Sequence, residues 1–273
     1  RITQSGILLE DTIGGIYRMR LEPESVAKTM DTTSDVIMFN AALIDKPIEA
    51  PTTRQRLVLE LEGPLSESHL FSDERQQMTM QNGIVRFVAN KVSLDGFTPR
   101  TFPITDEEFA QWLKPSPFIQ SDDPRIVEKA KEIIGDEKNA FRAASLLCQW
   151  VHDNVRKQYS AALSNALDVL DSMEGDCTEH SVLFVALARA AGIPAKEVAG
   201  LVYTAPEKKP GFYFHQWATV YVGKWLDMDP MFNQPLPDVT HIKLAEGDLL
   251  HQVQLIPIIG KIRVRVFEEE TTS

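Results

Sequence analysis

Apolar and polar residues alternate along the first third of the chain. The alternating runs cover residues 15–21, 36–44 and 55–61. Side chains at every second position share one face of a strand, so these runs predict sheets with one buried face. Gly63-Pro64, Asn82-Gly83 and Asp95-Gly96 separate the runs and are typical of turns. We therefore expect an all-β, sandwich-like region here.

The pattern changes where prolines accumulate. Five of them, Pro99, Pro103, Pro115, Pro117 and Pro124, fall in or next to residues 97–123, which predicts a linker with a short helix near residues 106–112. Beyond it the apolar spacing becomes helical, and we expect helices near residues 124–133, 139–155 and 165–173. We place the domain boundary accordingly, with residues 1–118 as the β domain and linker and residues 119–273 as a second domain.

A further helix is predicted from about Cys177 to about Ala191. Asp176 can cap its start, and Gly192 ends it. Its sides are apolar nearly all round, which is typical of a buried core helix. Unpaired N–H groups and the helix dipole at its start favour a thiolate over a thiol. Cys177 is therefore a candidate nucleophile, and a buried inert cysteine is the alternative.

Strands return after this helix, near residues 196–203, 213–222, 224–228 and 260–267. Helices followed by antiparallel strands predict an α+β domain. His215 lies within the second of these strands, and Asp229 follows the third, just before Pro230. A nucleophilic cysteine needs a base, and the base needs a group that orients it. Antiparallel neighbours could bring His215 and Asp229 side by side, opposite Cys177.

Motifs spread over residues 121–244 resemble the transglutaminase-like family. They are Trp150-Val151, Asn154-Val155, Gly175-Asp176-Cys177, residues 190–195, His215-Gln216-Trp217 and residues 225–230. The chain looks most like bacterial members in which Gly-Asp-Cys-Thr-Glu-His is followed by an Asp-Pro segment and by residues 240–244. The resemblance implies a papain-like α+β fold, with Cys177, His215 and Asp229 as nucleophile, base and orienting aspartate. Met231 departs from the family's usual threonine or serine but lies outside this triad.

The resemblance also implies a reaction class. We expect acyl transfer through a thioester on Cys177, with hydrolysis of an amide or peptide bond in a peptide or protein substrate. A lysine amine as acceptor would instead make a cross-linking transglutaminase. A vestigial triad would leave a binding or scaffold module. No metal or organic cofactor is implied.

The oxyanion of such a reaction needs hydrogen-bond donors. The Cys177 backbone N–H is one, and Gln158, Tyr159 and Trp150 are candidates for the other. Trp217 could line the substrate groove or pack in the core.

The sequence also suggests roles for the remaining acids and histidines. Asp227 and Asp229 are two residues apart, so strand alternation places both on the same face and cannot distinguish them. We prefer Asp229 as the orienting acid because the strand must end at Pro230. Asp227 is expected to pair with a base such as Lys224. A zinc site of Cys177, His180, His215 and Asp229 is the alternative to the triad. His241 and His251 are expected to be structural, because their surroundings in the sequence show no acid or nucleophile partner.

Composition narrows the partners. A net charge of −11 over 273 residues argues against nucleic acid. No run approaches the roughly 20 apolar residues of a membrane-spanning helix, so we expect none in this sequence. Cys148 and Cys177 are the two cysteines, and we expect both to be free thiols. The first residue is not methionine, so a leader could have been removed. We favour an extracytoplasmic over a cytoplasmic location and leave the oligomeric state open.

Overall fold

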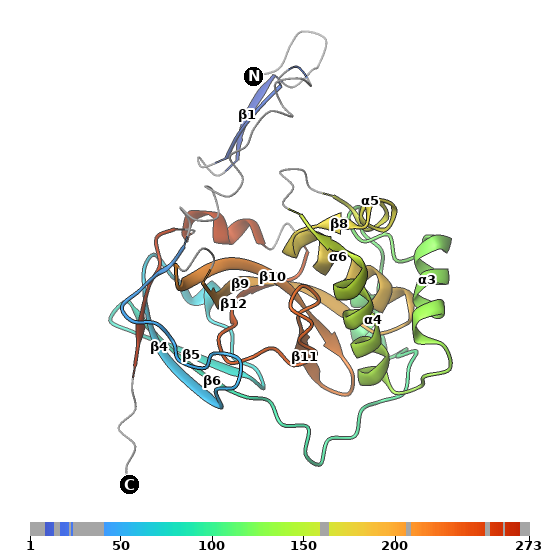
Figure 1. The fold of residues 1–273 in the computed structure, drawn as a ribbon, viewed down its shortest axis with the longest axis horizontal. Helices are drawn as coiled ribbons and strands as arrows, with labels where there is room; N and C mark the ends of the chain where they lie inside the picture. The colour runs from blue at the N-terminus through green and yellow to red at the C-terminus, as the bar shows by residue number, and fades with distance from the viewer. Residues whose placement is uncertain are drawn as a thin grey trace.

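The computed structural model describes residues 9–13, 17–21, 23, 41–158, 164–205, 209–248, 252–258 and 260–267 (Figure 1). The first described elements, β1 (Glu10–Ile13) and β2 (Tyr17–Arg20), form an antiparallel hairpin. The strand expected at residues 36–44 lies mostly outside the described residues, and β3 (Leu43–Ile44) marks its end. Among the described residues, no helix is both long and apolar enough to cross a membrane.

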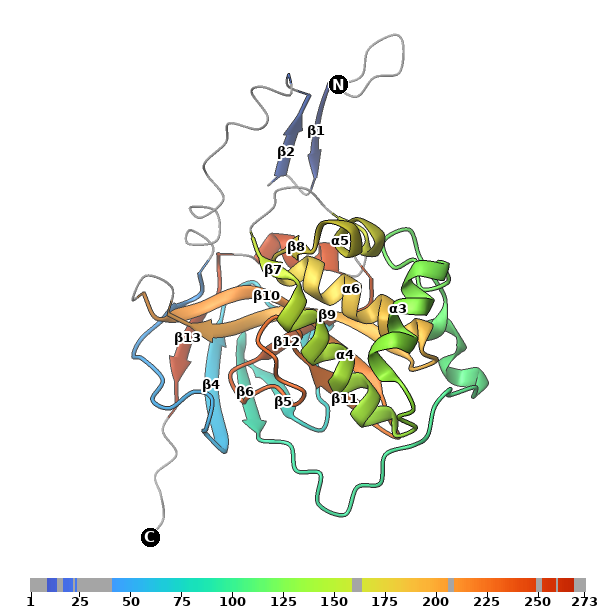
Figure 2. The same ribbon diagram turned by 45° about the vertical axis from the view of Figure 1, so that its right-hand side comes forward.

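A four-stranded antiparallel sheet forms the centre of the molecule. Its order is β11 (Trp225–Met228), β10 (Gly211–Tyr221), β9 (Ala195–Thr204) and β12 (Ile242–Glu246). The first three confirm the predicted strands, and β12 has no counterpart among the predictions. In Figures 1 and 2 this sheet lies between the helices and a second, five-stranded sheet. The mixed helical and antiparallel architecture confirms the predicted α+β class.

The helices surround α6 (Cys177–Ala190). The others are α3 (Pro124–Ile134), α4 (Ala140–Asn154) and α5 (Ala166–Ser172), and each of them contacts α6. Residues 182–188 of α6 are all buried, as expected for a helix that is apolar on every side. Each large apolar side chain buried in this way contributes about 1.5–3 kcal/mol by leaving water. The rigid core therefore fixes where α6 begins, which is the position of Cys177.

The five-stranded sheet has the order β3, β13 (Arg263–Val266), β4 (Arg56–Glu62), β6 (Ile84–Asn90) and β5 (Gln76–Gln81). The predicted Asn82-Gly83 turn joins β5 to β6 with positive φ at both residues, the geometry for which this pair is favoured. Apolar residues of this sheet share one buried cluster with residues of the central sheet. The cluster includes Leu57, Leu59, Leu61, Val85, Phe87, Leu201, Phe212, Ile242 and Leu244. The buried face of the first region is thus covered by the second.

The last strand corrects one expectation. We predicted residues 260–267 as a strand of the second domain, but β13 pairs antiparallel with β4 and parallel with β3. Val264 and Val266 join the apolar cluster of this sheet, while Arg265 forms ion pairs with Glu60 and Glu62 of β4. Alternation reveals which side chains face inward, but it does not reveal which sheet the strand joins.

The predicted linker is packed against the helical region. Ile104 and Ile119 are buried in the core formed by the helices, and the Ile104 N–H donates to Gly192 O. The short helix within it is the 3₁₀ helix η2 (Glu107–Leu113). Two further 3₁₀ helices are η1 (Glu67–His69) and η4 (Val253–Ile258).

The division of the chain at residues 118 and 119 stays a prediction. The apolar cluster shared by the two sheets indicates how residues 119–273 should behave when they are produced alone. We expect residues 119–273, produced alone, to aggregate or to unfold at a lower temperature than the whole chain, because β13 loses its partner β4 and the central sheet loses its apolar cover. Size-exclusion chromatography and thermal unfolding measure this. A fragment as stable and cooperative as the whole chain would instead support an independent domain.

Candidate active site

Cys177 is the first residue of α6 and is partly exposed. The turn before it is closed by a capping box, in which Asp176 accepts from the Thr178 N–H and Glu179 accepts from the Asp176 N–H at 3.0 Å. Gly175 permits this arrangement, because a Cβ there would lie 2.1 Å from the Glu179 Cβ. The local sequence therefore places the thiol at a helix N-terminus, where a negative charge is stabilised.

The two acids of this turn do not both add full negative charge beside the thiol. Burial, followed by the hydrogen bond and charge of Glu179, raises the pKa of Asp176 to about 7. At neutral pH the Asp176 carboxyl is therefore partly protonated. A thiolate on Cys177 meets less repulsion than two ionised neighbours would cause.

His215 of β10 and Asp229, just after β11, are in direct contact. The His215 Nε2 donates to the Asp229 Oδ2 at 2.7 Å, and both side chains are buried. Because Nε2 is engaged by the carboxylate, Nδ1 is the ring nitrogen that can serve Cys177. The Cys177 side chain also interacts with His215 and contributes to the shift of its pKa. The three predicted residues are therefore brought together.

The charges of this group reinforce each other. Burial lowers the pKa of His215, but the charge and hydrogen bond of Asp229, with a contribution from Cys177, raise it to about 9. Burial raises the pKa of Asp229, but His215 and His241 hold it well below its usual range. At neutral pH the pair is an imidazolium and a carboxylate, as a thiolate partner requires.

Asp229 is held in one orientation. Its Oδ1 accepts from the backbone N–H groups of Met231 at 2.8 Å and Phe232 at 3.0 Å. The Phe232 ring stacks on His215, with centroids 4.9 Å apart and an interplanar angle of 17°. The other carboxylate oxygen of Asp229, Oδ2, is therefore free to accept from the histidines.

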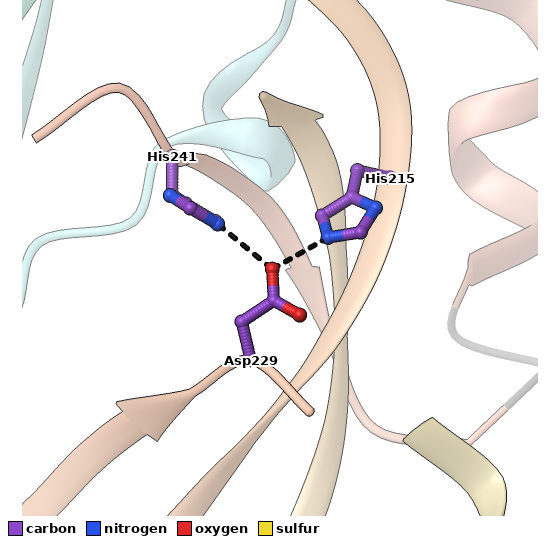
Figure 3. A group of neighbouring side chains, drawn as sticks. All are labelled: His215, Asp229 and His241. Atoms are coloured by element: carbon purple, nitrogen blue, oxygen red, sulfur yellow. Dashed lines mark hydrogen bonds and ion pairs between the residues drawn. The ribbon is translucent and has the colours of Figure 1, made fainter. Parts of the chain in front are cut away.

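His241 is the site residue that sequence reasoning missed. Its Nε2 lies 3.0 Å from the Asp229 Oδ2, the same oxygen that binds His215 (Figure 3). His241 is fully buried, and its Nδ1 lies 3.4 Å from the Asp238 Oδ1. We expected no acid partner for it, which is wrong. Asp238, three residues earlier, was the available signal.

The four oxyanion and groove candidates lie in different places. The Gln158 N–H donates to Gly175 O at 3.0 Å, which places Gln158 beside the strand that leads into Cys177. Trp150 lies on α4, with the Lys129 Nζ of α3 5.6 Å from its ring centroid. Trp217 is fully buried, and its Nε1 donates to Asp227 at 3.2 Å. Tyr159 and also His251 lie outside the described residues.

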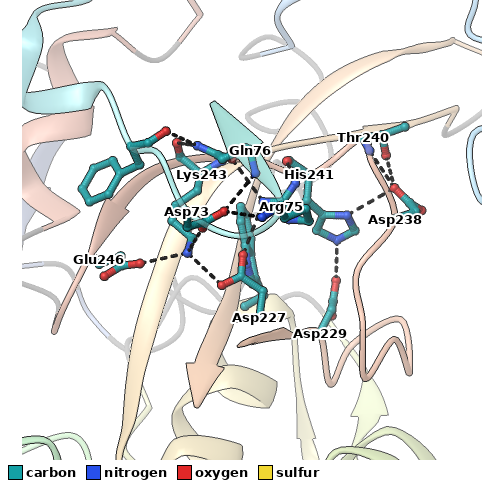
Figure 4. Close-up of polar contacts among 12 residues, drawn as sticks. Asp73, Arg75, Gln76, Asp227, Asp229, Asp238, Thr240, His241, Lys243 and Glu246 are labelled. Carbon is teal, nitrogen blue, oxygen red and sulfur yellow. Dashed lines mark hydrogen bonds and ion pairs between the residues drawn. The ribbon is translucent and has the colours of Figure 1, made fainter. Parts of the chain in front are cut away.

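Asp227 belongs to a buried ion cluster rather than pairing with Lys224. Its carboxylate contacts the Lys243 Nζ at 2.8 Å and the Arg75 guanidinium at 3.3 Å (Figure 4). Burial raises the pKa of Asp227, but the charges of Lys243 and Arg75 together have the larger effect and hold it below its usual value. Arg75 also donates to the backbone carbonyl of His241. Lys224 pairs instead with Glu74 at 3.0 Å. The segment just before β5 of the five-stranded sheet therefore contacts the residues around Asp229.

The zinc alternative is not assembled by the described residues. Both ring nitrogens of His180 face backbone carbonyls, Asp176 O at 2.6 Å and Val155 O at 3.2 Å. The group with a composition suited to a metal is His215, Asp229 and His241, whose donor atoms lie within 4.8 Å of one another. The hydrogen bonds of both histidines to Asp229 account for this closeness.

The two thiols should differ sharply in reactivity. Burial, with a smaller effect from the charge of Asp229, raises the pKa of Cys148 far above its usual value, and its side chain is fully buried. Cys177 is partly exposed and interacts with His215. We expect iodoacetamide at pH 6 to label Cys177 at least about 100-fold faster than Cys148. Peptide mass spectrometry of the alkylated chain measures both rates, and equal slow labelling would contradict the assignment.

Part of the chain is similar to known proteins. Residues 127–230 match the model of the transglutaminase-like superfamily. An uncharacterised protein of Haemophilus influenzae is 33% identical over 123 residues, which are 43% of this chain and 33% of that protein. The chain thus aligns with about a third of this relative. A candidate cysteine protease from Cytophaga hutchinsonii has a similar fold, with a TM-score of 0.54 at 18% identity over 80% of this chain and 89% of that one. The periplasmic domain of TgpA from Pseudomonas aeruginosa gives a TM-score of 0.45 at 16% identity, over 82% and 81%.

A core helix that begins at a cysteine and packs beside an antiparallel sheet carrying the histidine defines a papain-like fold. Cys177, His215 and Asp229 all lie within residues 127–230, the segment that matches the transglutaminase-like superfamily.

Proposed function

We propose that the chain is a cysteine-dependent acyl-transfer enzyme that hydrolyses an amide or peptide bond. The observation that carries the proposal is the chain of contacts from a helix-start cysteine through His215 to the buried Asp229. A vestigial triad would have no need of a buried, charged histidine and aspartate, whose desolvation is costly. The intact contacts therefore favour an enzyme over a scaffold module.

Each group has a defined part in the reaction. The Cys177 Sγ attacks the substrate carbonyl carbon, and the resulting oxyanion accepts from the Cys177 N–H and from the side-chain amide of Gln158. His215 then gives its proton to the leaving nitrogen, the C–N bond breaks, and an amine and a thioester remain. Water attacks the thioester while His215 takes one of its protons. The acid product leaves, and Cys177 and His215 are restored.

Peptides and proteins are the proposed substrates. Acceptor choice separates the proposal from cross-linking, in which a lysine amine replaces water in the second half of the reaction. The extracytoplasmic location stays a prediction from the sequence.

Two assays run together test the proposal. The purified chain and the Cys177→Ser variant are incubated with a fluorogenic peptide mixture, and separately with casein and a fluorescent primary amine. We expect peptide hydrolysis that requires Cys177 and little incorporation of the amine. Amine incorporation faster than hydrolysis would assign a cross-linking enzyme. Neither reaction, together with an unreactive Cys177 thiol, would assign a scaffold module.

A further inference from the structure

Two imidazole rings share one carboxylate oxygen at the site. The Asp229 Oδ2 is 2.7 Å from the His215 Nε2 and 3.0 Å from the His241 Nε2 (Figure 3). His215 comes from β10, whereas His241 lies just before β12 and belongs to a separate loop. The triad uses His215 and Asp229 and leaves His241 without a role. A fully buried histidine on the triad's aspartate requires an explanation.

The contacts of His241 determine its charge. Both of its ring nitrogens face carboxylates, Nε2 facing Asp229 and Nδ1 facing Asp238 at 3.4 Å (Figure 4). A neutral imidazole carries one N–H, so its second nitrogen would point a lone pair at a carboxylate oxygen. An imidazolium donates to both. Burial lowers the pKa of His241, but Asp229 and Asp238 raise it above the usual value.

Asp238 is fixed as an anion for this contact. Its Oδ1 accepts from the Thr240 N–H at 2.9 Å and the Thr240 hydroxyl at 2.6 Å, and its Oδ2 accepts from Gln234 at 3.1 Å. Burial raises the pKa of Asp238, but His241 and the two hydrogen bonds from Thr240 lower it to about 2. The acid is therefore ionised throughout the neutral range.

The other charged groups around His241 in the described chain are few. His215 lies on the far side of Asp229, with ring centroids 5.9 Å apart, and Arg75 donates to the His241 carbonyl. The ring centroids of Trp217 and Phe232 lie 5.3 Å and 6.4 Å from that of His241. Trp217 in turn donates to Asp227, and the Lys157 Nζ lies 5.9 Å from the Phe232 centroid. Beyond Trp217, Asp227 is paired with Lys243. The charges thus alternate from Asp238 through His241 and Asp229 to His215, which interacts with Cys177.

We infer that His241 is a second, permanently charged histidine of the site, which offsets part of the Asp229 charge and so sets the pH range over which Cys177 and His215 form an ion pair. His241 touches neither substrate nor thiol, so it is a positioning residue. The inference rests on the proposed function of Cys177 and His215.

The sign of the effect follows from electrostatics. A positive charge close to an ionisable pair makes each loss of a proton easier, so its removal makes both losses harder. At a separation of about 6 Å in a protein interior, one charge moves a titration by roughly one to two pH units. Losing the His241 charge should therefore move both titrations of the Cys177–His215 pair to higher pH.

The first test is the pH profile of Cys177 alkylation by iodoacetamide in the whole chain and in His241→Gln. Glutamine can still donate to Asp229 but carries no charge. We expect both midpoints to move upward by roughly one unit, which slows alkylation about tenfold below the lower midpoint. Lys129→Gln, which removes an α3 cation paired with Glu132, should leave the midpoints in place. A folded His241→Gln chain with unmoved midpoints would make His241 merely structural.

A second measurement does not depend on a variant that folds. Nitrogen-15 NMR of the unmodified chain reports whether both His241 ring nitrogens are protonated. We expect an imidazolium at pH 8, and in Asp238→Asn a titration midpoint at lower pH. A neutral His241 at pH 7 would overturn the inference. An imidazolium at His241 together with an unreactive Cys177 in the unmodified chain would instead contradict the proposed function, while the charge of His241 would be established.

Discussion

Replacing Asp229 with asparagine is expected to slow thioester formation by about 10³- to 10⁴-fold, by analogy with other triads. The loss comes from the position of a proton. Backbone N–H groups of Met231 and Phe232 hold one side-chain oxygen of Asp229. An asparagine at this position would keep its oxygen there and turn its NH₂ group toward the histidines.

The amide would then donate where the carboxylate accepts. His215 would have to accept at Nε2 and carry its proton on Nδ1, the nitrogen that faces Cys177. A ring in that tautomer cannot take a proton from the thiol. The stacked Phe232 ring keeps His215 in place, so the defect should be chemical rather than positional.

Stopped-flow kinetics with an activated ester, together with circular dichroism of the variant, measure this effect. The expected result is a folded protein with a rate of acyl-enzyme formation reduced by the stated factor. A loss smaller than tenfold in a folded variant would show that Asp229 does not orient the base.

Asp227→Asn is the matched change two residues away, and we expect it to affect stability instead. Asp227 balances Lys243 and Arg75 in a cluster that is almost fully buried. Removal of one partner from a buried ion pair typically costs about 3–5 kcal/mol, because the remaining charges lose their compensation. The rate of thioester formation should fall less than about tenfold, since Asp227 contacts Trp217 behind His215 and not the base itself.

Urea unfolding followed by fluorescence gives the change in the free energy of unfolding, and the same ester assay gives the rate. A large rate defect with unchanged stability would move the orienting role from Asp229 to Asp227. The pair of variants therefore separates the two aspartates, which strand alternation alone treats alike.

The local parts of the fold could be predicted from the sequence. The helix from Cys177 follows from its cap and its apolar surface, and β9, β10 and β11 follow from their residue patterns. These features depend on neighbours in the chain. The sequence favours Asp229 because Pro230 must end the strand, and the structure places Asp229 in contact with His215.

The long-range parts could not be predicted, because they depend on contacts between distant segments. Arg75 lies 152 residues from its partner Asp227, and its sequence context resembles any polar turn. His241 is buried by a loop whose path no periodicity describes. The alternation of β13 fits either sheet equally well until β4 supplies its partner. The role of a residue whose partners are distant in the sequence therefore becomes evident only from the folded structure.

The central claim is that Cys177 forms a thioester with the help of His215. Intact-protein mass spectrometry after rapid quenching of the chain with a p-nitrophenyl ester, followed by peptide mapping, tests it most directly. We predict one added acyl group on Cys177 that is lost on further incubation, no adduct in Cys177→Ser, and slow formation in His215→Ala. An acyl group on Cys148, or equally fast acylation in His215→Ala, would contradict the account.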